Sequence, residues 1–194
     1  MSISVPNNDK ASKKPSRKNE RIQNFREPKF EAPAESLPPQ NLEAEEAILG
    51  GILLDPDAIS RIADLLQPEA FYLNSHRQIF RTALMLHSQG KPTDLTAMSA
   101  WLADTGSLEK IGGNNRLVEL VDRVTSTASL EQVAKLVMDK YLRRQLIRSG
   151  NEVIQLGFDQ QLAMEDVLDQ AEQKIFAISQ EKPSKGLTPT AEIL

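Results

Sequence analysis

No proline occurs between Pro92 and Pro183, a span that covers almost half of the 194 residues. Proline interrupts helices and the interiors of sheets, so a span without it can form long unbroken elements. No part of the chain alternates apolar and polar residues as a half-buried strand does, whereas apolar residues recur at helical spacing. The sequence therefore predicts an all-α fold.

Seven helices follow from this spacing together with caps such as Asn41 and breakers such as Gly106. They are expected at 41–54, 55–66, 74–90, 94–105, 114–124, 129–158 and 163–181. Ser129 and Gln132 have the spacing of a capping box at the start of the sixth helix. These elements predict a small helical globule followed by a long antiparallel helical hairpin, because a connection of only four residues joins the last two helices.

Two pairs of glycines need an explanation in a helical chain. Gly50 and Gly51 fall inside the first predicted helix and weaken it by about 1 kcal/mol each relative to alanine. They are tolerable if another helix must approach closely there. Gly112-Gly113 precedes a helix but follows no strand, so it is interpreted as a turn rather than a phosphate-binding loop.

The hairpin carries more apolar surface than two helices can cover. The stripe on 129–158 changes face partway, which predicts that one half packs on the chain's own body and the other on something else. The stripe on 163–181 is typical of a single buried face, and Phe176 lies outside it and requires a second surface. We interpret the hairpin as an association element; packing against the first five helices is the alternative. The candidate interface residues are Leu146, Val153, Ile154, Val167, Leu168, Ala171, Ile175, Phe176 and Ile178.

Charge is unevenly distributed along the chain. Residues 1–37 carry eight Lys/Arg and five Asp/Glu, a balance of +3 in a chain whose net charge is −4. This segment is rich in proline and its few large apolar residues follow no period, which predicts a disordered basic tail. The predicted organisation continues with a helical globular subdomain at 38–128 and the helical hairpin at 129–181.

Several kinds of site are excluded or disfavoured. The absence of cysteine excludes disulfides, zinc–thiolate sites and cysteine nucleophiles, and fits a cytoplasmic location. The sequence has no G-x-x-x-x-G-K-[ST] loop and no apolar run of about 18 residues, so a P-loop and a membrane span are not expected. His76 and His87 lie about 16 Å apart on one helix and are interpreted as core-edge residues. A stand-alone enzyme is therefore the least favoured hypothesis. Five carboxylates are interpreted as solvated residues at helix starts: Glu43, Glu45, Glu46, Asp55 and Asp57.

A basic cluster on the sixth helix supports an alternative function. Acidic neighbours dilute this cluster, so a solvated face is the plainer interpretation, but contact with nucleic-acid phosphates is the alternative. A helical DNA-binding or regulatory protein would then act through the cluster and the basic tail. Its residues are Lys140, Arg143, Arg144 and Arg148.

Six segments together resemble one known family. The opening segment, PPQNLEAEEAILGGILLD at 38–55, resembles the start of the N-terminal domain of the bacterial replicative helicase DnaB. The other segments follow in the order expected of that family: FYLNSHRQIF at 71–80, DLTAMSAWL at 94–102, LVEL at 117–120, MDKYLRRQLI at 138–147 and AEQKIFAISQ at 171–180.

The resemblance covers 38–194 and implies a specific role. In this family the domain assembles as dimers into a hexameric ring collar that docks primase and the helicase loader. Residues 182–194 resemble the start of the linker to a RecA-like motor that is absent from this chain. The resemblance therefore implies no cofactor in this chain, since ATP and Mg²⁺ belong to the motor. It also implies contact with DNA only through the whole ring, a cytoplasmic location and no membrane partner.

Overall fold

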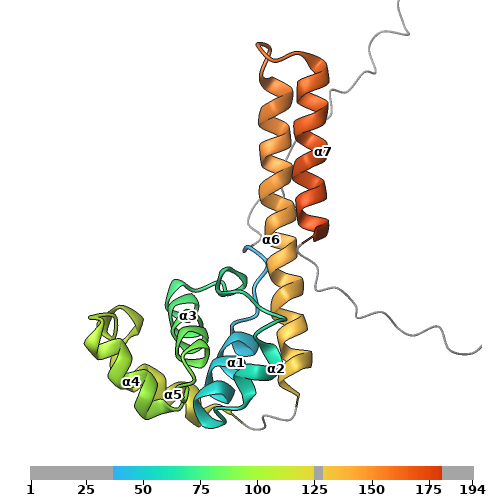
Figure 1. Cartoon of the computed structure of the whole chain (residues 1–194). Helices are drawn as coiled ribbons and strands as arrows, with labels where there is room; N and C mark the ends of the chain where they lie inside the picture. Colours follow the sequence, from blue (N-terminus) through green and yellow to red (C-terminus); the bar gives the residue numbers. More distant parts are fainter. Residues whose placement is uncertain (1–36, 125–128, 181–194) are drawn as a thin grey trace, which may run out of the picture. The chain divides into compact units, whose positions relative to one another are not determined.

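The computed structural model describes residues 37–124 and 129–180. This part of the chain contains α-helices and short 3₁₀ helices and no strand, which confirms the all-α prediction (Figure 1). The elements are α1 (Leu42–Leu54), α2 (Ala58–Ile62), η1 (Pro68–Ala70), α3 (Asn74–Ser88), α4 (Leu95–Asp104), η2 (Glu109–Ile111), α5 (Gly113–Asp122), α6 (Leu130–Phe158) and α7 (Met164–Gln180). The linker predicted at 182–194 and all but the last residue of the predicted tail lie outside the described residues.

Helix α1 lies at the centre of the core and is buried along most of its length. Its two glycines let neighbouring helices approach closely, as the sequence predicts. A Cβ atom at Gly50 would lie 2.1 Å from the carbonyl oxygen of Leu120 in α5, and one at Gly51 would lie 2.9 Å from the Leu130 side chain in α6. Close packing of α1 against both helices therefore depends on the absence of these side chains.

The predicted helix starts at Asn41, Asp94 and Ser129 are confirmed, but the capping box predicted at Ser129 does not form. The Asn41 side chain accepts a hydrogen bond from the Ala44 N–H at 3.0 Å, and Asp94 caps α4 in the same way. Ser129 makes no side-chain cap bond within the described part of the chain, because its backbone is not extended (φ −114°, ψ 20°). The Ser129 carbonyl oxygen instead accepts the first bonds of the helix, from Gln132 and Val133.

The predicted boundaries are wrong for the shortest helices. Helix α2 ends at Ile62 rather than near residue 66, and a turn follows in which the Ile62 carbonyl accepts from both Leu65 and Leu66. Helices η1 and η2 have three residues each, fewer than one period of an apolar pattern, so the sequence offers no signal for them. Gly112 and Gly113 both have positive φ, +102° and +74°, and form the predicted turn at the start of α5, which begins at Gly113.

Helix α6 belongs to both the core and the hairpin. Its first half buries five side chains against α1, α2 and η1: Leu130, Ala134, Val137, Met138 and Tyr141. Its second half extends past these elements and packs with α7, which runs antiparallel to it (Figure 1). The sequence predicts that α6 packs through two different faces. This prediction is confirmed for its first half, which packs against the globule. The alternative, in which the hairpin packs against the first five helices, is wrong for α7, which packs with α6.

Candidate functional site

Arg144, on α6 where the helix leaves the core, joins the hairpin to the globule. Its guanidinium donates hydrogen bonds to the carbonyl oxygens of Pro39 at 2.7 Å and Ala70 at 2.5 Å. The same group lies 5.6 Å from the ring centre of Tyr72 and 5.9 Å from that of Tyr141, so cation–π attraction adds to the bonds. Burial lowers the pKa of Arg144 from its ordinary value. The basic cluster is therefore not one solvated face, because one of its four members is a packing residue.

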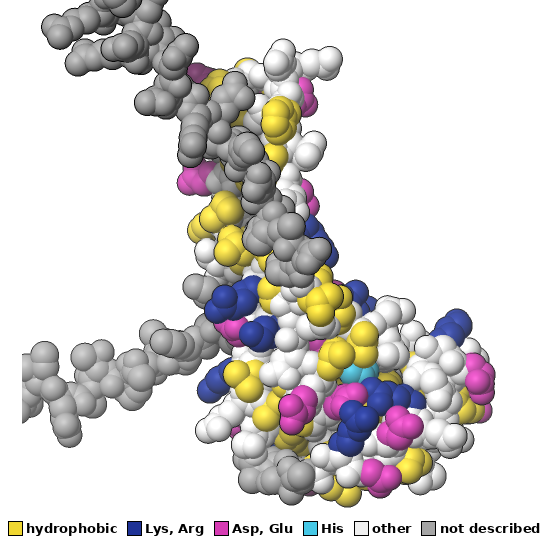
Figure 2. Space-filling model, turned by 180° about the vertical axis from the view of Figure 1, so that it is seen from behind, with side chains coloured by type: hydrophobic (Ala, Val, Ile, Leu, Met, Phe, Trp, Pro, Cys, Tyr) yellow, Lys and Arg dark blue, Asp and Glu magenta, His cyan; other side chains and the backbone are white. Residues whose placement is uncertain are grey.

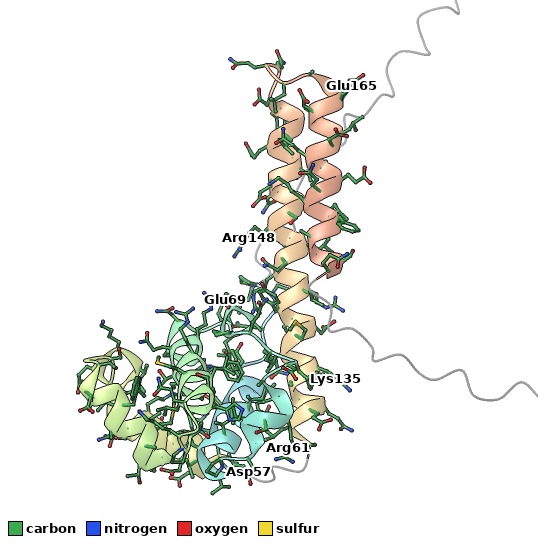
Figure 3. The ribbon with its side chains drawn as sticks, in the orientation of Figure 1. Asp57, Arg61, Glu69, Lys135, Arg148 and Glu165 are labelled. Atoms are coloured by element: carbon green, nitrogen blue, oxygen red, sulfur yellow. The ribbon has the colours of Figure 1, made fainter. Side chains whose placement is uncertain are left out.

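The other three basic residues lie toward the solvent. Arg143 is exposed and donates to Asp139 at 2.9 Å, a bond that raises the pKa of the guanidinium. Lys140 is half-buried, and Arg148 is exposed and extends outward from α6 (Figure 3). Contact of Lys140, Arg143 and Arg148 with nucleic acid stays a hypothesis.

Two members of the cluster, Arg144 and Arg148, should respond differently to truncation. We expect Arg144→Ala to lower the free energy of unfolding by about 2 kcal/mol, since two carbonyl groups lose a charged donor. Arg148→Ala, one turn further along the same helix, should change it by less than about 0.5 kcal/mol. Urea denaturation followed by circular dichroism measures both values, and equal losses would contradict the packing role of Arg144.

The hairpin leaves a long apolar face uncovered. No side chain of α7, which the structure describes from end to end, is buried, so the expected single buried face on this helix is wrong for the chain alone. The upper groove, our name for a hollow of about 670 Å³ between α6 and α7, is walled mainly by apolar residues. They are Gly150, Val153, Leu168, Ala171, Ile175 and Phe176.

A second hollow continues this face toward the core. This lower groove, of about 420 Å³, is lined by Leu142, Leu146, Ile175 and Ile178 together with the Asp139–Arg143 pair. Ile175 lines both grooves, so the two hollows follow one another along the same side of the hairpin. Figure 2 shows apolar side chains along the hairpin on the face visible there.

The structure divides the nine candidate interface residues into two sets. Val153, Val167, Ala171 and Ile178 are half-buried where α6 meets α7. The exposed set is Leu146, Ile154, Leu168, Ile175 and Phe176. Leu168 and Phe176 each keep 61% of their surface in solvent. Four of these five, Leu146, Leu168, Ile175 and Phe176, line the two grooves. Large apolar side chains gathered on one exposed face are typical of a surface for association.

A buried polar network, which the sequence interpretation missed, joins α1 to α3. Glu45 and His76 are fully buried, so the interpretation of Glu45 as a solvated residue is wrong. The Glu45 carboxylate accepts from the Tyr72 N–H at 2.6 Å and from His76 Nδ1 at 2.8 Å. His76 Nε2 lies 3.1 Å from an Arg116 nitrogen, and because arginine only donates, Nε2 accepts. These partners assign the neutral imidazole with its proton on Nδ1.

Arg116 extends this network to the surface. It donates to Glu46 at 2.7 Å, and Arg123 donates to the second oxygen of the same carboxylate. Burial alone would raise the pKa of Glu46, but the hydrogen bonds and charges of the two arginines outweigh it and hold that pKa below its ordinary value. The network therefore connects α1 and α3 with α5 and is a structural centre of the globule.

The remaining residues considered for chemistry do not gather into a site. His87 is exposed, not at the edge of the core, because the last turn of α3 and the residues after it, 87–90, are all open to solvent. No group of three or more His, Asp or Glu side chains in the described residues could hold a metal ion. Among those same residues, no helix is both long and apolar enough to cross a membrane.

One surface hollow has no counterpart in the sequence interpretation. It measures about 410 Å³ and lies between α4 and α5, where Leu95, Ala100 and Val118 provide apolar walls and Ser99 and Asn114 a polar edge. The short side chains of Thr96, Ser99 and Ala100 along one face of α4 are the only sequence signal for it.

Comparison with known proteins gives concordant results. A family model described as the DnaB-like helicase N terminal domain matches residues 37–139. Replicative DNA helicase DnaB of Nostoc is 56% identical over 158 residues, which cover 81% of this chain and 18% of that protein. The chain thus spans about a fifth of the length of this curated relative.

Two solved structures share the fold. The crystal structure of the N-terminal domain of DnaB helicase from Mycobacterium tuberculosis is 35% identical, with a TM-score of 0.67 over 73% of this chain and 99% of that chain. A structure of a DnaB-like replicative helicase and its interactions with primase is 27% identical, with a TM-score of 0.63, and matches 73% of this chain and 31% of that chain.

Proposed function

Because the chain belongs to the family of DnaB-like helicase N-terminal domains, we propose that it assembles a replicative DNA helicase into a ring and docks the primase there. In this proposal the residues of this chain catalyse no reaction themselves. ATP and Mg²⁺ bind in a motor domain outside these residues, DNA is contacted only by the whole ring, and the assembly works in the cytoplasm.

One observation carries the assembly part of the proposal: the uncovered apolar face of the hairpin. The described residues offer nothing to cover Leu146, Leu168, Ile175 or Phe176, which line the two grooves, and each large apolar side chain removed from water contributes about 1.5–3 kcal/mol. Two hairpins that pack together would bury this face as a four-helix arrangement does. Dimers formed in this way would be the building unit of a hexameric ring.

Breaking the face with charge should therefore dissociate the assembly. We expect Leu146→Glu combined with Ile175→Glu to shift the mass measured by light scattering to that of one chain, 21.6 kDa. The reason is that two buried carboxylates without partners would cost several kcal/mol at the contact. Light scattering of the unaltered chain should give a multiple of this mass.

A matched control comes from the globule. Leu54 and Val118 are 56% and 45% exposed, close to the 54% and 45% of Leu146 and Ile175. Their double replacement by glutamate adds the same charge and should leave the assembly intact. A mass of one chain for the unaltered protein at every concentration, or an equal effect of the two double variants, would contradict assembly through the hairpin.

The docking part of the proposal is supported by the neighbour that was solved with its interactions with primase. We propose that the primase, and in turn the helicase loader, bind the collar that the hairpins build. Co-purification of the primase of the same organism with this chain tests this part separately from assembly.

A further inference from the structure

The Nε2 atom of His76 can be occupied in two ways that exclude each other. The ring is fully buried, and its Nδ1 donates to the Glu45 carboxylate at 2.8 Å. The other nitrogen, Nε2, has one lone pair, which accepts from an Arg116 nitrogen at 3.1 Å. A proton on Nε2 would turn this acceptor into a donor that faces another donor. A protonated ring and a bound Arg116 are therefore incompatible.

Neither neighbour of the ring takes up a proton as readily as Nε2. The Glu45 carboxylate faces two donors, the Tyr72 N–H and His76 Nδ1, so a proton on it would add a third donor to a buried site. Burial alone would lower the pKa of Arg116, but its hydrogen bonds to Glu46 and Glu119 outweigh this and raise that pKa, so the guanidinium stays charged. In acid, Nε2 is the atom of this network that gains a proton.

The other charged side chains around α3 bind elsewhere or lie in solvent. Those in ion pairs with one another, or bonded to backbone carbonyl groups, are Arg61, Glu69, Arg77, Arg81 and Arg144. Arg144 is close enough to Glu45 for their charges to interact, and it is a permanent cation. The charged residues of α4 and η2 are exposed and so cannot face a buried ring: Asp104, Glu109 and Lys110. Glu45 and Arg116 are therefore the charges in direct contact with His76.

Arg116 ties three helices together. It belongs to α5, donates to Glu46 of α1 at 2.7 Å and donates to His76 of α3. Its side chain keeps 20% of its surface in solvent, so it can turn outward and still bind Glu119, on its own helix, at 3.2 Å. Without Arg116, the polar link that the described residues retain between α5 and α1 is weaker, because Glu46 then binds only Arg123, just past the end of α5.

We propose that His76 is a pH-sensitive switch that controls how firmly α5 is held on the globule. The neutral ring binds Arg116 and so keeps α5 against α1 and α3. In acid a proton binds at Nε2, Arg116 turns toward the solvent, and the charged ring stays in place as an ion pair with Glu45. Histidine is the side chain whose ordinary titration falls in the range of mildly acidic and neutral pH. The switch lies in the globule alone and does not depend on the assembly or docking proposed above.

Nuclear magnetic resonance follows both partners in the full chain labelled with ¹⁵N at histidine and arginine. In a titration from about pH 8 to about pH 5, we expect the His76 ring to start with a proton on Nδ1 only and to gain one on Nε2. The side-chain signals of Arg116 should change with the same midpoint, because a single event moves both groups. A proton on Nε2 at the start, no proton on Nε2 at the end, or protonation that leaves the Arg116 signals unchanged would overturn the inference.

The two histidines of the chain provide a variant and its matched control. In His76→Gln the amide oxygen can still accept from Arg116 but does not titrate, so the Arg116 signals should stay constant over the same pH range. His87 is exposed on the same helix, and His87→Gln should leave the response of Arg116 within about 0.2 pH unit of that in the unaltered chain. A response of Arg116 that survives in His76→Gln, or is lost equally in both variants, would contradict the switch.

Arg116→Met tests the reverse direction while it keeps the histidine. Without a cation at Nε2, the ring should gain its proton at least about 0.5 pH unit higher than in the unaltered chain, since linkage between two sites is reciprocal. An unchanged midpoint would show that the proton and Arg116 do not compete.

Hydrogen exchange measures the consequence for α5. Corrected for the intrinsic effect of pH, the protection of the α5 amides should fall at least about threefold between about pH 7.5 and about pH 5.5 in the unaltered chain. In Arg116→Met it should already be low and should not change with pH over this range. An equal fall in both proteins would overturn the inference, because α5 would then loosen in acid without the release of Arg116.

Discussion

Replacing Glu45 by alanine is expected to lower the free energy of unfolding by about 3–5 kcal/mol, since it leaves a buried polar network without its acceptor. The Glu45 carboxylate accepts from both the His76 ring and the Tyr72 backbone, and the interior around Glu45 and His76 excludes water. The buried His76 ring and the half-buried Tyr72 N–H would both lose their acceptor, and a buried group without a partner costs about 1–3 kcal/mol. Urea denaturation at one fixed protein concentration measures the loss, because the assembly proposed above would also contribute to stability.

The control for this experiment lies two residues earlier on the same helix. Glu43 is exposed in the first turn of α1, so Glu43→Ala should cost no more than about 0.5 kcal/mol. Glu45→Gln should fall between the two, because its amide oxygen can accept from one donor while its NH₂ group faces the other. A Glu45→Ala variant as stable as Glu43→Ala would show that the network does not hold α1 to α3.

Gly50→Ala is expected to destabilise the fold by about 3 kcal/mol through overpacking alone. The new methyl group would lie 2.1 Å from a backbone oxygen, that of Leu120, and 2.5 Å from a methyl group of Val124. Backbone cannot rotate away as a side chain can, so α5 would have to move relative to α1. The same denaturation measurement gives the loss.

Alanine at two other glycines should change the free energy of unfolding by less, in the order of the space around each glycine. At Gly51 the obstacle is the far end of the Leu130 side chain, at 2.9 Å, so Gly51→Ala should cost only about 1 kcal/mol. At Gly157 nothing lies within 4 Å, so Gly157→Ala should stabilise α6 by about 0.5 kcal/mol. Any other order of the three variants would contradict close helix approach as the reason for Gly50.

The sequence predicted the long elements well because a long pattern averages out local exceptions. Helix α6, expected at 129–158, is observed at Leu130–Phe158. Three-residue helices such as η1 have no pattern to average, and the end of α2 depends on a turn that propensities do not mark. The position of Glu45 did hold a signal, since it precedes Leu49 and Ile52 by four and seven residues and so shares their buried face. What makes this burial possible is His76, 31 residues further on, and no periodicity places it there.

For the candidate site, the sequence could supply the residues but not their surroundings. A helical stripe looks the same whether its own chain or another molecule covers it, so Leu168 and Ile175 were expected in a buried face and are exposed in this chain. The basic cluster shows the same limit. Arg144 and Arg148 are one turn apart, yet only Arg144 meets carbonyl groups that lie 74 and 105 residues away in sequence. Both distinctions depend on tertiary packing.

The continuity of α6 has a thermodynamic consequence. Leu130 and Tyr141 are part of the core, and Gly150 and Val153 line the upper groove, all on one uninterrupted helix. Unfolding the core therefore removes the scaffold of the hairpin, and the two cannot melt as independent units. By mass action, whatever binds along the hairpin raises the free energy of unfolding of the core as well. An assembly built along the hairpin, as proposed, would therefore stabilise the fold of each subunit through a single helix.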